Sequence, residues 1–452
     1  WLFVAWPGPA ALAADAGAAT TERTLENGLK VIVREDHRAP TAIQMIWYRA
    51  GSIDEVNGRT GIAHVLEHMM FKGTEAYGDG EFSKRVAAHG GRENAFTNRD
   101  YTAYFQQVPP TALNEMMMLE ADRMANLRLQ DEPFAKELAV VMEERRQRVE
   151  DSPFGQVGEQ LMAQAFTASP YRSPVIGWMN DLQNLTPADA RRWYQNWYAP
   201  NNAVLIVAGD VQPEAVFAQA EQTYGQIERR ALPERRPQTE PPQRGIRRVV
   251  VKAPAESPYL VMGFKVPRLT DLDQAEDVFA LEMLAAVLSS GDTGRLTREL
   301  VRDQQLANDA DAGFGMLGRG PALFTLSGTP VQDRTVAELE TALRGQVSRI
   351  ADAGVDEHEL RRIKAQYVAS RVFGRDSLYG QVMEIGLLEM VGLSHRDADA
   401  LLDKVRAVNA EQVQRVAAQY FGDDQLTVVT LEPQALETRA SSPVDPSVEV
   451  KH

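Results

Sequence analysis

The segment GIAHVLEHMMFKGT, residues 61–74, places two histidines four residues apart with a glutamate directly before the second. Its apolar residues recur at helical spacing, which predicts a helix over residues 61–70. Side chains four residues apart lie on one helix face, about 5–6 Å apart at Cβ, so the imidazoles of His64 and His68 can reach one metal ion. Glu67 lies beside them, where its carboxylate can take a proton from a metal-activated water without being a ligand.

The competing interpretation is an ordinary helix that carries three polar residues on its wet side. With seven histidines in the chain, this spacing arises by chance on the order of once in a hundred such chains. No other histidine is part of such a pair. His358-Glu359 is similar in composition, but Arg362 stands where a second histidine would be needed. The spacing therefore favours a metal centre.

Composition narrows both the ligands and the partners. The 452 residues are 44% hydrophobic and 25% charged, as in soluble globular proteins, and suffice for two or three domains. Because the chain has no cysteine, a metal must be held by His, Asp or Glu. A formal net charge of −15 makes nucleic acid a poor partner.

The pattern predicts an α+β protein of two homologous domains, each a mainly antiparallel sheet packed with helices. Residues 21–228 read as strands followed by long helices, and residues 229–245 are rich in Pro, Arg and Glu, as linkers are. Residues 246–434 repeat the order, and WYAPNNAVLIVAGD matches QYFGDDQLTVVTLEP as helix end, turn and strand. We predict an internal duplication whose second copy lacks the histidine pair; two unrelated α+β domains are the alternative.

Both ends of the chain have distinctive compositions. WLFVAWPGPAALAADA is apolar, too short to span a bilayer, and contains Ala11-Leu12-Ala13, which fits an export-signal cleavage site. We expect residues 1–20 to be a signal-peptide remnant, with an N-terminal arm as the alternative, and the protein to be exported, to the periplasm. We expect residues 435–452 to be a disordered tail.

The motif HxxEH at His64–His68 is the inverted zincin motif, and its surroundings resemble the pitrilysin and mitochondrial-processing-peptidase family, M16. The segments that resemble the family, in its order, are GSIDE (51–55), GIAHVLEHMMFKGT (61–74), NAFTNRDYTAYF (94–105), ELAVVMEE (137–144) and SPYRSPVIGWMNDL (169–182). The resemblance implies the family's fold and a metallopeptidase activity that depends on one zinc ion per chain. The same ligand types also suit Mn²⁺ or Co²⁺.

The resemblance further implies that the third ligand is a glutamate downstream, in a helix of the form E-x6-E. Glu144 fits that place and Glu137 is the first glutamate, which we expect to orient a histidine from behind. Two helical turns separate them, so they share a face, whereas Glu143 points about 100° away. A charged outer face of an amphipathic helix is the alternative for this stretch.

In the family, the segment that corresponds to NAFT forms a sheet edge on which a substrate peptide adds as a further strand. The resemblance thus makes Asn94, Ala95, Phe96 and Thr97 candidate substrate-binding residues, since backbone pairing gives affinity without strict sequence choice. A plain core strand is the alternative.

The sequence departs from the family pattern in its later half. Relatives carry there an Arg and a Tyr, seven apart, that help to hold the substrate, and the matching positions in GRLTRELVRDQQLAN are Val301 and Asn308, with Arg302 one residue away. Family members of this length assemble in pairs. The resemblance therefore implies that a homologous partner subunit supplies the Arg and Tyr in a heterodimer, with a homodimer as the alternative.

The leading functional hypothesis is a zinc-dependent endopeptidase that acts on peptides or unfolded polypeptides, with Glu67 as general base. One alternative is a non-catalytic structural or assembly subunit of a complex of this family. Another is a peptide-binding or zinc-storage protein, which would keep the ligands but not need Glu67.

Overall fold

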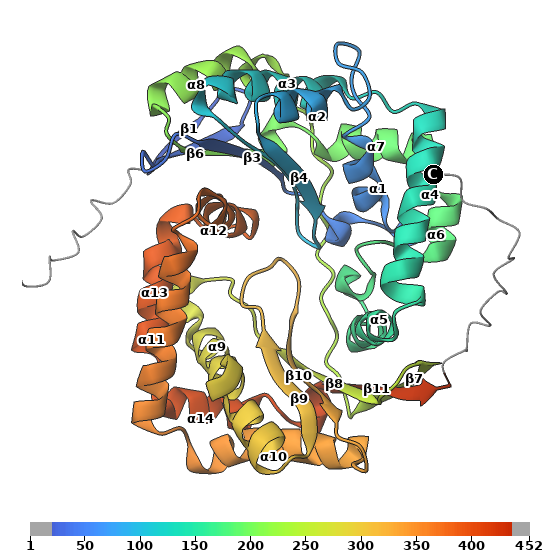
Figure 1. Cartoon of the computed structure of the whole chain (residues 1–452), viewed down its shortest axis with the longest axis vertical. Helices are drawn as coiled ribbons and strands as arrows, with labels where there is room; N and C mark the ends of the chain where they lie inside the picture. Colours follow the sequence, from blue (N-terminus) through green and yellow to red (C-terminus); the bar gives the residue numbers. More distant parts are fainter. Residues whose placement is uncertain (1–19, 436–452) are drawn as a thin grey trace, which may run out of the picture.

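The computed structural model describes residues 20–435, which form two halves, each a sheet with its helices (Figure 1). The predicted signal remnant and the predicted disordered tail lie outside the described residues, apart from Thr20 and Ala435. Within residues 20–435, none of the helices has the length and apolar character that crossing a membrane requires.

The first half, residues 20–226, is built on a six-stranded sheet of order β1-β2-β6-β3-β5-β4. Only β2 and β6 pair in parallel, and the other neighbours are antiparallel. The strands are β1 (Thr20–Thr24), β2 (Lys30–Glu35), β3 (Ala42–Tyr48), β4 (Arg92–Thr97), β5 (Thr102–Val108) and β6 (Ala203–Gly209). The helices are α1 (Ile62–Met69), α2 (Glu81–Ala88), α3 (Leu113–Asn126), α4 (Asp131–Arg145), α5 (Pro153–Ala165), α6 (Met179–Asn184), α7 (Pro187–Trp197) and α8 (Pro213–Gln222).

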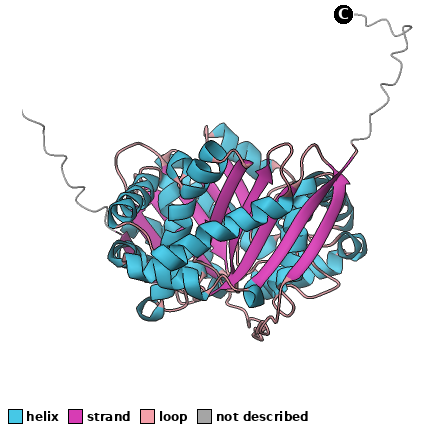
Figure 2. Ribbon diagram, turned by 90° about the horizontal axis from the view of Figure 1, so that it is seen from below, coloured by secondary structure: helices cyan, strands magenta, loops and turns pink. Residues whose placement is uncertain are grey.

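The second half, residues 247–434, is built on a five-stranded sheet of order β7-β11-β8-β10-β9. Here β7 and β11 pair in parallel, and the remaining pairs are antiparallel. The strands are β7 (Arg247–Pro254), β8 (Tyr259–Val266), β9 (Ala307–Phe314), β10 (Ala322–Pro330) and β11 (Leu426–Gln434). The helices are α9 (Glu276–Leu288), α10 (Val336–Ala353), α11 (Glu357–Gly374), α12 (Leu378–Met390), α13 (Ala398–Ala407) and α14 (Ala410–Gln419). Figure 2 shows helices lying across the strands of the sheet.

The two sheets have the same topology. Once β1 is set aside, the order β2-β6-β3-β5-β4 corresponds strand by strand to β7-β11-β8-β10-β9, and the single parallel pair falls at the same place in each. Two unrelated domains would not share this order. The predicted α+β fold of two homologous units is confirmed.

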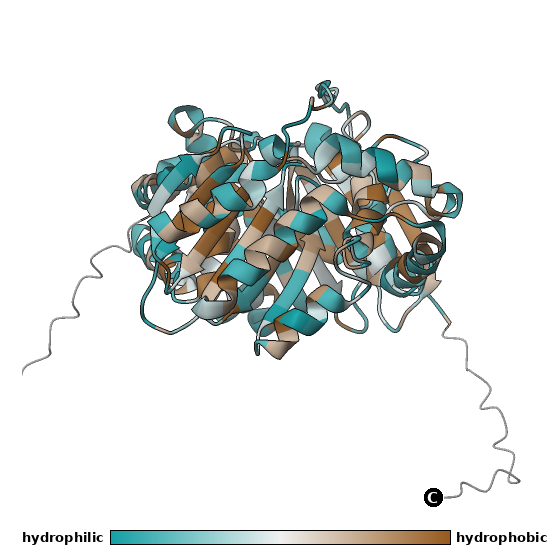
Figure 3. Cartoon of the chain, turned by 90° about the horizontal axis from the view of Figure 1, so that it is seen from above, coloured by the Kyte–Doolittle hydropathy of each residue, from teal (hydrophilic) through white to brown (hydrophobic). Residues whose placement is uncertain are grey.

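Each sheet is covered on one face by its own half and on the other by a helix from the opposite half. In the first sheet, alternate residues such as Val31 and Ile46 pack on the first half's helices, while Ile32 and Trp47 face α12. In the second sheet, one face packs on α9 and α10, and the other faces α5 through Leu161. The apolar residues accordingly gather on the strands and the inner sides of the helices (Figure 3).

The two exchanged helices, α5 and α12, correspond to each other. In the sequence of its half, each follows the pair of long helices and precedes the last strand. α12 packs against β3 and β6, and α5 packs against β7, β8 and β11. β3 and β6 are buried along their whole length, and all their residues except Gln44 are apolar or aromatic, as this cover on both faces requires.

The connection between the halves contains no helix or strand over residues 227–246, yet it is held closely. The Glu240 carboxylate accepts hydrogen bonds from the backbone N–H groups of Thr167, Ala168 and Ser169 at 2.8–3.0 Å and pairs with Lys265 at 3.0 Å. Burial alone would raise its pKa, but these partners lower the pKa of Glu240 to about 2.

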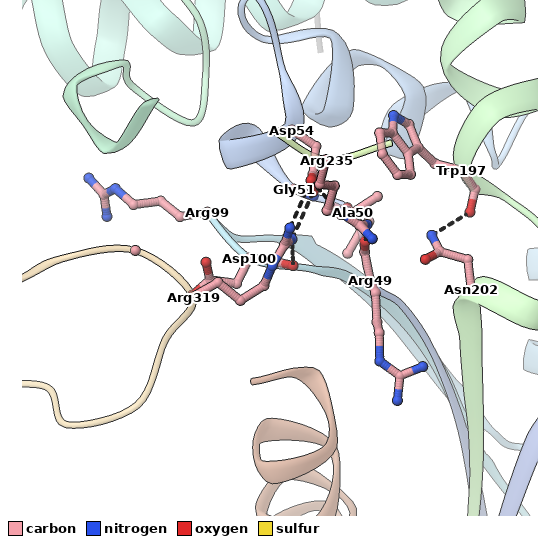
Figure 4. A network of polar contacts seen from close by, with 12 residues as sticks. Arg49, Ala50, Gly51, Asp54, Arg99, Asp100, Trp197, Asn202, Arg235 and Arg319 are labelled. Atoms are coloured by element: carbon pink, nitrogen blue, oxygen red, sulfur yellow. Dashed lines mark hydrogen bonds and ion pairs between the residues drawn. The ribbon is translucent and has the colours of Figure 1, made fainter. Parts of the chain in front are cut away.

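A second tie centres on the buried carboxylate of Asp54 (Figure 4). Arg235, from the connection, donates to Asp54 Oδ1 at 2.7 Å, and Arg319, from the loop between β9 and β10, donates to both oxygens at 2.8 Å. Arg319 also donates to the backbone oxygen of Asp100 at 3.1 Å. The connection and this loop of the second half therefore converge on one acid of the first half.

The contact of α12 with the first sheet gives a stability prediction. A Cβ added at Gly386 of α12 would lie 2.1 Å from Cε2 of Trp47, whose ring is fully buried against Phe96 and Tyr101. Gly386→Ala should therefore lower the free energy of unfolding by about 1–3 kcal/mol, the cost of overpacking a filled site. Urea-induced unfolding measures this change.

The matched control is Gly345→Ala in α10, where an added Cβ meets nothing within 4 Å. The same replacement should there raise the free energy of unfolding by about 0.5–1 kcal/mol, because alanine favours a helix. Equal effects at the two glycines would contradict the close packing of α12 on Trp47.

Candidate metal centre

Helix α1 begins at a left-handed glycine and a buried carboxylate. Gly61, the residue before the helix, has φ 88°, and Glu55 accepts hydrogen bonds from the N–H groups of Gly61 and Ala63, both at 2.9 Å. These bonds satisfy N–H groups that a helix start leaves unpaired. Burial raises the pKa of Glu55 to about 8, although both hydrogen bonds act in the opposite direction.

The histidines of α1 face the C-terminal part of α4. Glu144 Oε2 lies 3.7 Å from His64 Nε2 and 3.6 Å from His68 Nε2, and the two imidazole rings are 4.9 Å apart at their centroids. One donor atom from each of the three residues falls within 4.8 Å of the others. α1 packs directly on α4, which sets this approach.

These donors fit a zinc ion. Tetrahedral bonds of about 2.0–2.1 Å place neighbouring ligand atoms about 3.3–3.5 Å apart, close to the 3.6–3.7 Å between Glu144 and each imidazole. Two neutral imidazoles and one carboxylate also form a donor set that catalytic zinc sites use, with a fourth position left for water. Burial, more than the neighbouring His68, lowers the pKa of His64 to about 3, so its imidazole is neutral, as a ligand must be.

A further layer of charged groups holds the ligands. Glu137 Oε2 lies 3.2 Å from Nδ1 of His68, the ring nitrogen opposite the one that faces Glu144, and Glu137 Oε1 pairs with Lys72 at 2.7 Å. Arg148 donates to Glu144 Oε1 at 2.7 Å, which leaves Oε2 directed at the histidines. Glu143 points elsewhere, half exposed and paired with Arg146.

The carboxylate of Glu67 is buried at the same site. Thr97 Oγ1, at the end of β4, donates to Glu67 Oε2 at 2.5 Å. Burial raises the pKa of Glu67 above its ordinary value, more than the Thr97 hydrogen bond lowers it. A carboxyl group with a raised pKa is suited to taking up and returning a proton near neutral pH.

A cavity of about 650 Å³ opens beside these groups. Its walls include His64, Glu67, His68 and Glu144, together with all four residues of NAFT from β4, Asn94–Thr97. β4 is an edge strand, paired only with β5. Residues of α5 and of the segment 172–176 line the other side.

Several residues of this site were not singled out by sequence reasoning. Arg148 lies four residues after Glu144, so helical spacing was the signal available for it. Lys72 lies beyond the end of α1 and contacts Glu137, 65 residues away. The contact of Thr97 with Glu67 joins segments 30 residues apart, and no local pattern marks it.

The positions of the missing Arg and Tyr lie in the second half. Val301 is partly buried against that half's core, and Asn308 lies on β9, where its side-chain amide donates to the backbone oxygen of Pro330 at 3.4 Å. Arg302 pairs with Asp292 at 3.1 Å. None of these three residues lines the cavity at the histidines.

A second acidic group within residues 20–435 comprises Glu22, Glu389 and His395. Its centre is taken by the ammonium group of Lys30, 2.8 Å from Glu389 and 2.9 Å from Glu22. This group is an ion cluster between the halves, because the lysine supplies the positive charge that a metal would.

Comparison with known proteins shows to which family the chain belongs. Residues 30–177 match the family described as insulinase (peptidase family M16), and residues 184–367 match the peptidase M16 inactive domain. The zinc protease PqqE of Helicobacter pylori is 32% identical over 425 residues, which cover 91% of this chain and 92% of that protein. The chain belongs to peptidase family M16. The uncharacterized zinc protease YmxG of Bacillus subtilis is 24% identical, over 89% of this M16 chain and 95% of its own length.

Solved structures of this family share the fold. A crystal structure of a protease from Helicobacter pylori has a TM-score of 0.87 and 29% identity, and the match covers 92% of this chain and all of that one. The periplasmic protease PqqL from Escherichia coli has a TM-score of 0.75 and 18% identity, and the match covers 93% of this chain but 49% of that one. This M16 chain is therefore half-sized beside PqqL.

The contact between Glu137 and His68 gives a prediction about metal affinity. Glu137→Ala should weaken zinc binding about 10–100-fold, because the imidazole loses the partner that fixes its orientation. Competition with a chromogenic chelator measures the affinity. The control is Glu143→Ala on the same helix, which removes an equal charge from a half-exposed side chain and should leave the affinity unchanged; equal losses in both variants would contradict the assigned role of Glu137.

Proposed function

We propose that this M16 chain is a zinc-dependent endopeptidase that hydrolyses peptides or unfolded polypeptides. The observation that carries the proposal is the convergence of His64, His68 and Glu144 on one point, with the buried carboxylate of Glu67 on the same cavity wall. The three metal ligands alone would suffice for a zinc-storage protein. The Glu67 carboxylate beside them, with its raised pKa, is suited to proton transfer and so favours an enzyme.

In this mechanism His64, His68 and Glu144 would hold a zinc ion. When bound, zinc supplies Lewis acidity, which lowers the pKa of water and polarises the scissile carbonyl group. Glu67 accepts the proton of the attacking water and returns it to the leaving amine, and the hydroxyl of Thr97 keeps the Glu67 carboxylate in place through its hydrogen bond. Glu137 orients the imidazole of His68 from behind.

The proposed peptide site is the free edge of β4. Its residues Asn94–Thr97 line the cavity, and the edge has no strand partner on its outer side within residues 20–435. An extended peptide can add there through backbone hydrogen bonds, which favours unfolded segments over folded ones. The position of Thr97 at the end of this edge sets the peptide next to Glu67.

The chain lacks an Arg and a Tyr at Val301 and Asn308, and we propose that a homologous M16 subunit supplies them in a heterodimer. The half size relative to PqqL agrees with a two-chain assembly. A homodimer is the alternative.

We propose export to the periplasm, which the apolar start of the chain and the likeness to a periplasmic protease support.

A non-catalytic structural or assembly subunit is the second candidate function. The match of residues 184–367 to the M16 inactive domain favours it for the later part of the chain. The first half nevertheless retains both histidines, Glu67 and Glu144, which a purely structural subunit would not need.

Replacing the proposed base tests the enzyme directly. Glu67→Gln should lower kcat for a quenched fluorescent peptide mixture about 10²–10⁴-fold, because the amide cannot accept the proton. The zinc content, measured by atomic absorption, should stay at about one per chain, since Glu67 is not a ligand. Glu143→Gln serves as the control and should retain activity; a wild-type protein that binds zinc but cleaves nothing in any assembly would contradict the enzymatic proposal.

The partner proposal gives a separate prediction. The isolated chain should bind zinc and cleave weakly, and co-purification with a homologous subunit that carries the Arg and Tyr should raise kcat/KM at least tenfold, since charge stabilisation in the transition state is worth about 10²–10³-fold. High turnover by the isolated chain, with no gain from any partner, would refute the division of labour.

A further inference from the structure

Arginines line the cavity at the metal ligands, and two of them form no ion pair with a carboxylate within residues 20–435. Three arginines, Arg99, Arg148 and Arg172, line it. Arg148 is paired with Glu144 at 2.7 Å, which leaves Arg99 and Arg172 as the two arginines of the cavity without an ion pair within residues 20–435.

The Glu159 carboxylate, which also lines the cavity, forms no ion pair with Arg99 or Arg172. Glu159 is held by the buried Arg145 at 2.8 and 3.1 Å, a bidentate pair that directs both of its oxygens away from the other cations. Glu67 accepts its hydrogen bond from Thr97. A bound zinc ion would add further positive charge to the same space.

Arg99 lies two residues beyond the end of β4. Its Nε is buried without a hydrogen-bond partner, and within residues 20–435 its guanidinium makes no ion pair closer than 4.0 Å. Figure 4 shows it directed away from the carboxylate network of Asp54. Leaving the buried Nε of a guanidinium without a partner is costly, which indicates that a ligand completes the site.

The acid next to Arg99 in the sequence is engaged elsewhere. Both carboxylate oxygens of Asp100 accept the hydroxyl of Tyr171, at 2.6 and 2.7 Å, and Arg99 lies over the Tyr171 ring at 5.6 Å. Burial lowers the pKa of Arg99, an effect that the nearby Tyr171 and Asp100 only partly oppose. The ring thus supports the guanidinium from one side and leaves its donors available to the cavity.

Arg172 faces the same cavity from the segment that follows α5. It is exposed, and its one hydrogen bond is the donation from a guanidinium N–H to the backbone oxygen of Thr167 at 3.4 Å. No carboxylate within the described part of the chain pairs with it. The apolar side chains of Phe96, Phe154 and Met162 line the same cavity as the two arginines.

We propose that Arg99 and Arg172 form a subsite for a carboxylate group of the substrate, so that the enzyme prefers peptides with a negative charge near the cleaved bond. This proposal rests on the proposed peptidase function. The carboxylate can belong to an acidic side chain or to the peptide's C-terminus, since both offer the planar oxygen pair that a guanidinium binds.

The test compares peptides that differ in one carboxylate. One arm uses an N-acetylated, fluorescently labelled octapeptide series with Glu or Gln at each position in turn; the other uses one peptide with a C-terminal carboxylate or amide. Dissociation constants are measured by fluorescence anisotropy on the zinc-loaded Glu67→Gln chain, which binds without turnover. The ratio of kcat/KM values is measured on the active protein.

We expect the carboxylate form to bind about tenfold more tightly than its neutral counterpart in at least one arm, as a charge-assisted hydrogen bond provides. Arg99→Gln should bring this ratio close to one. Arg99→Lys should give an intermediate ratio, because it keeps the charge but loses the paired donors. The arm in which the ratio appears identifies the source of the carboxylate.

The control is Arg406→Gln in α13, which changes the net charge equally, far from α1 and α4 in Figure 1, and should keep the tenfold ratio. Arg172→Gln is the second variant should Arg99→Gln fail to fold by circular dichroism, and it should at least halve the ratio. A ratio near one in both arms of the parent protein, or a full ratio in both arginine variants, would overturn the subsite. A tenfold binding ratio without cleavage in any assembly would refute the peptidase function and leave the carboxylate subsite standing.

Discussion

The burial of each sheet's second face by a helix from the opposite half is the constraint on which the rest of this structure depends. α12 covers Ile32 and Trp47 of the first sheet, and α5 covers the second sheet through Leu161. Without these helices each sheet would expose a continuous apolar face to water, at a cost of roughly 25 cal/mol for every Å² of apolar surface. Each half therefore depends on the other to complete its hydrophobic core.

The metal centre depends on the same exchange. α1 and α4 carry the ligands, but the far wall of the cavity is formed partly by α5, through residues such as Phe154 and Met162. Because α5 is fixed by the second sheet, the second half shapes the site without providing a ligand. Two residues of the connection hold the same region from the outside: Arg235 contacts Asp54, and Glu240 accepts a hydrogen bond from the backbone of Thr167.

The sequence predicted the parts of this protein whose signals are local or shared with relatives. Helical spacing placed His64, Glu67 and His68 on one helix. The resemblance proposed Glu144, which the structure brings to the two histidines, and Glu137, which lies behind His68. α5 and α12 were not predicted as helices. In α12 the helical periodicity is weak, because the helix packs on more than one side and contains Gly380 and Gly386. The packing of each helix on the sheet of the opposite half is a long-range interaction, which a local sequence pattern does not predict.

The shared strand order and the exchanged helices also bear on how the chain folds. A single unit of this kind leaves one face of its sheet uncovered, so each unit needs a helix from the other to complete its fold. Residues 227–246 join the two units in one chain, which makes this pairing intramolecular and independent of concentration. The second unit therefore provides the helix that the first requires, although it has no counterpart of the histidine pair.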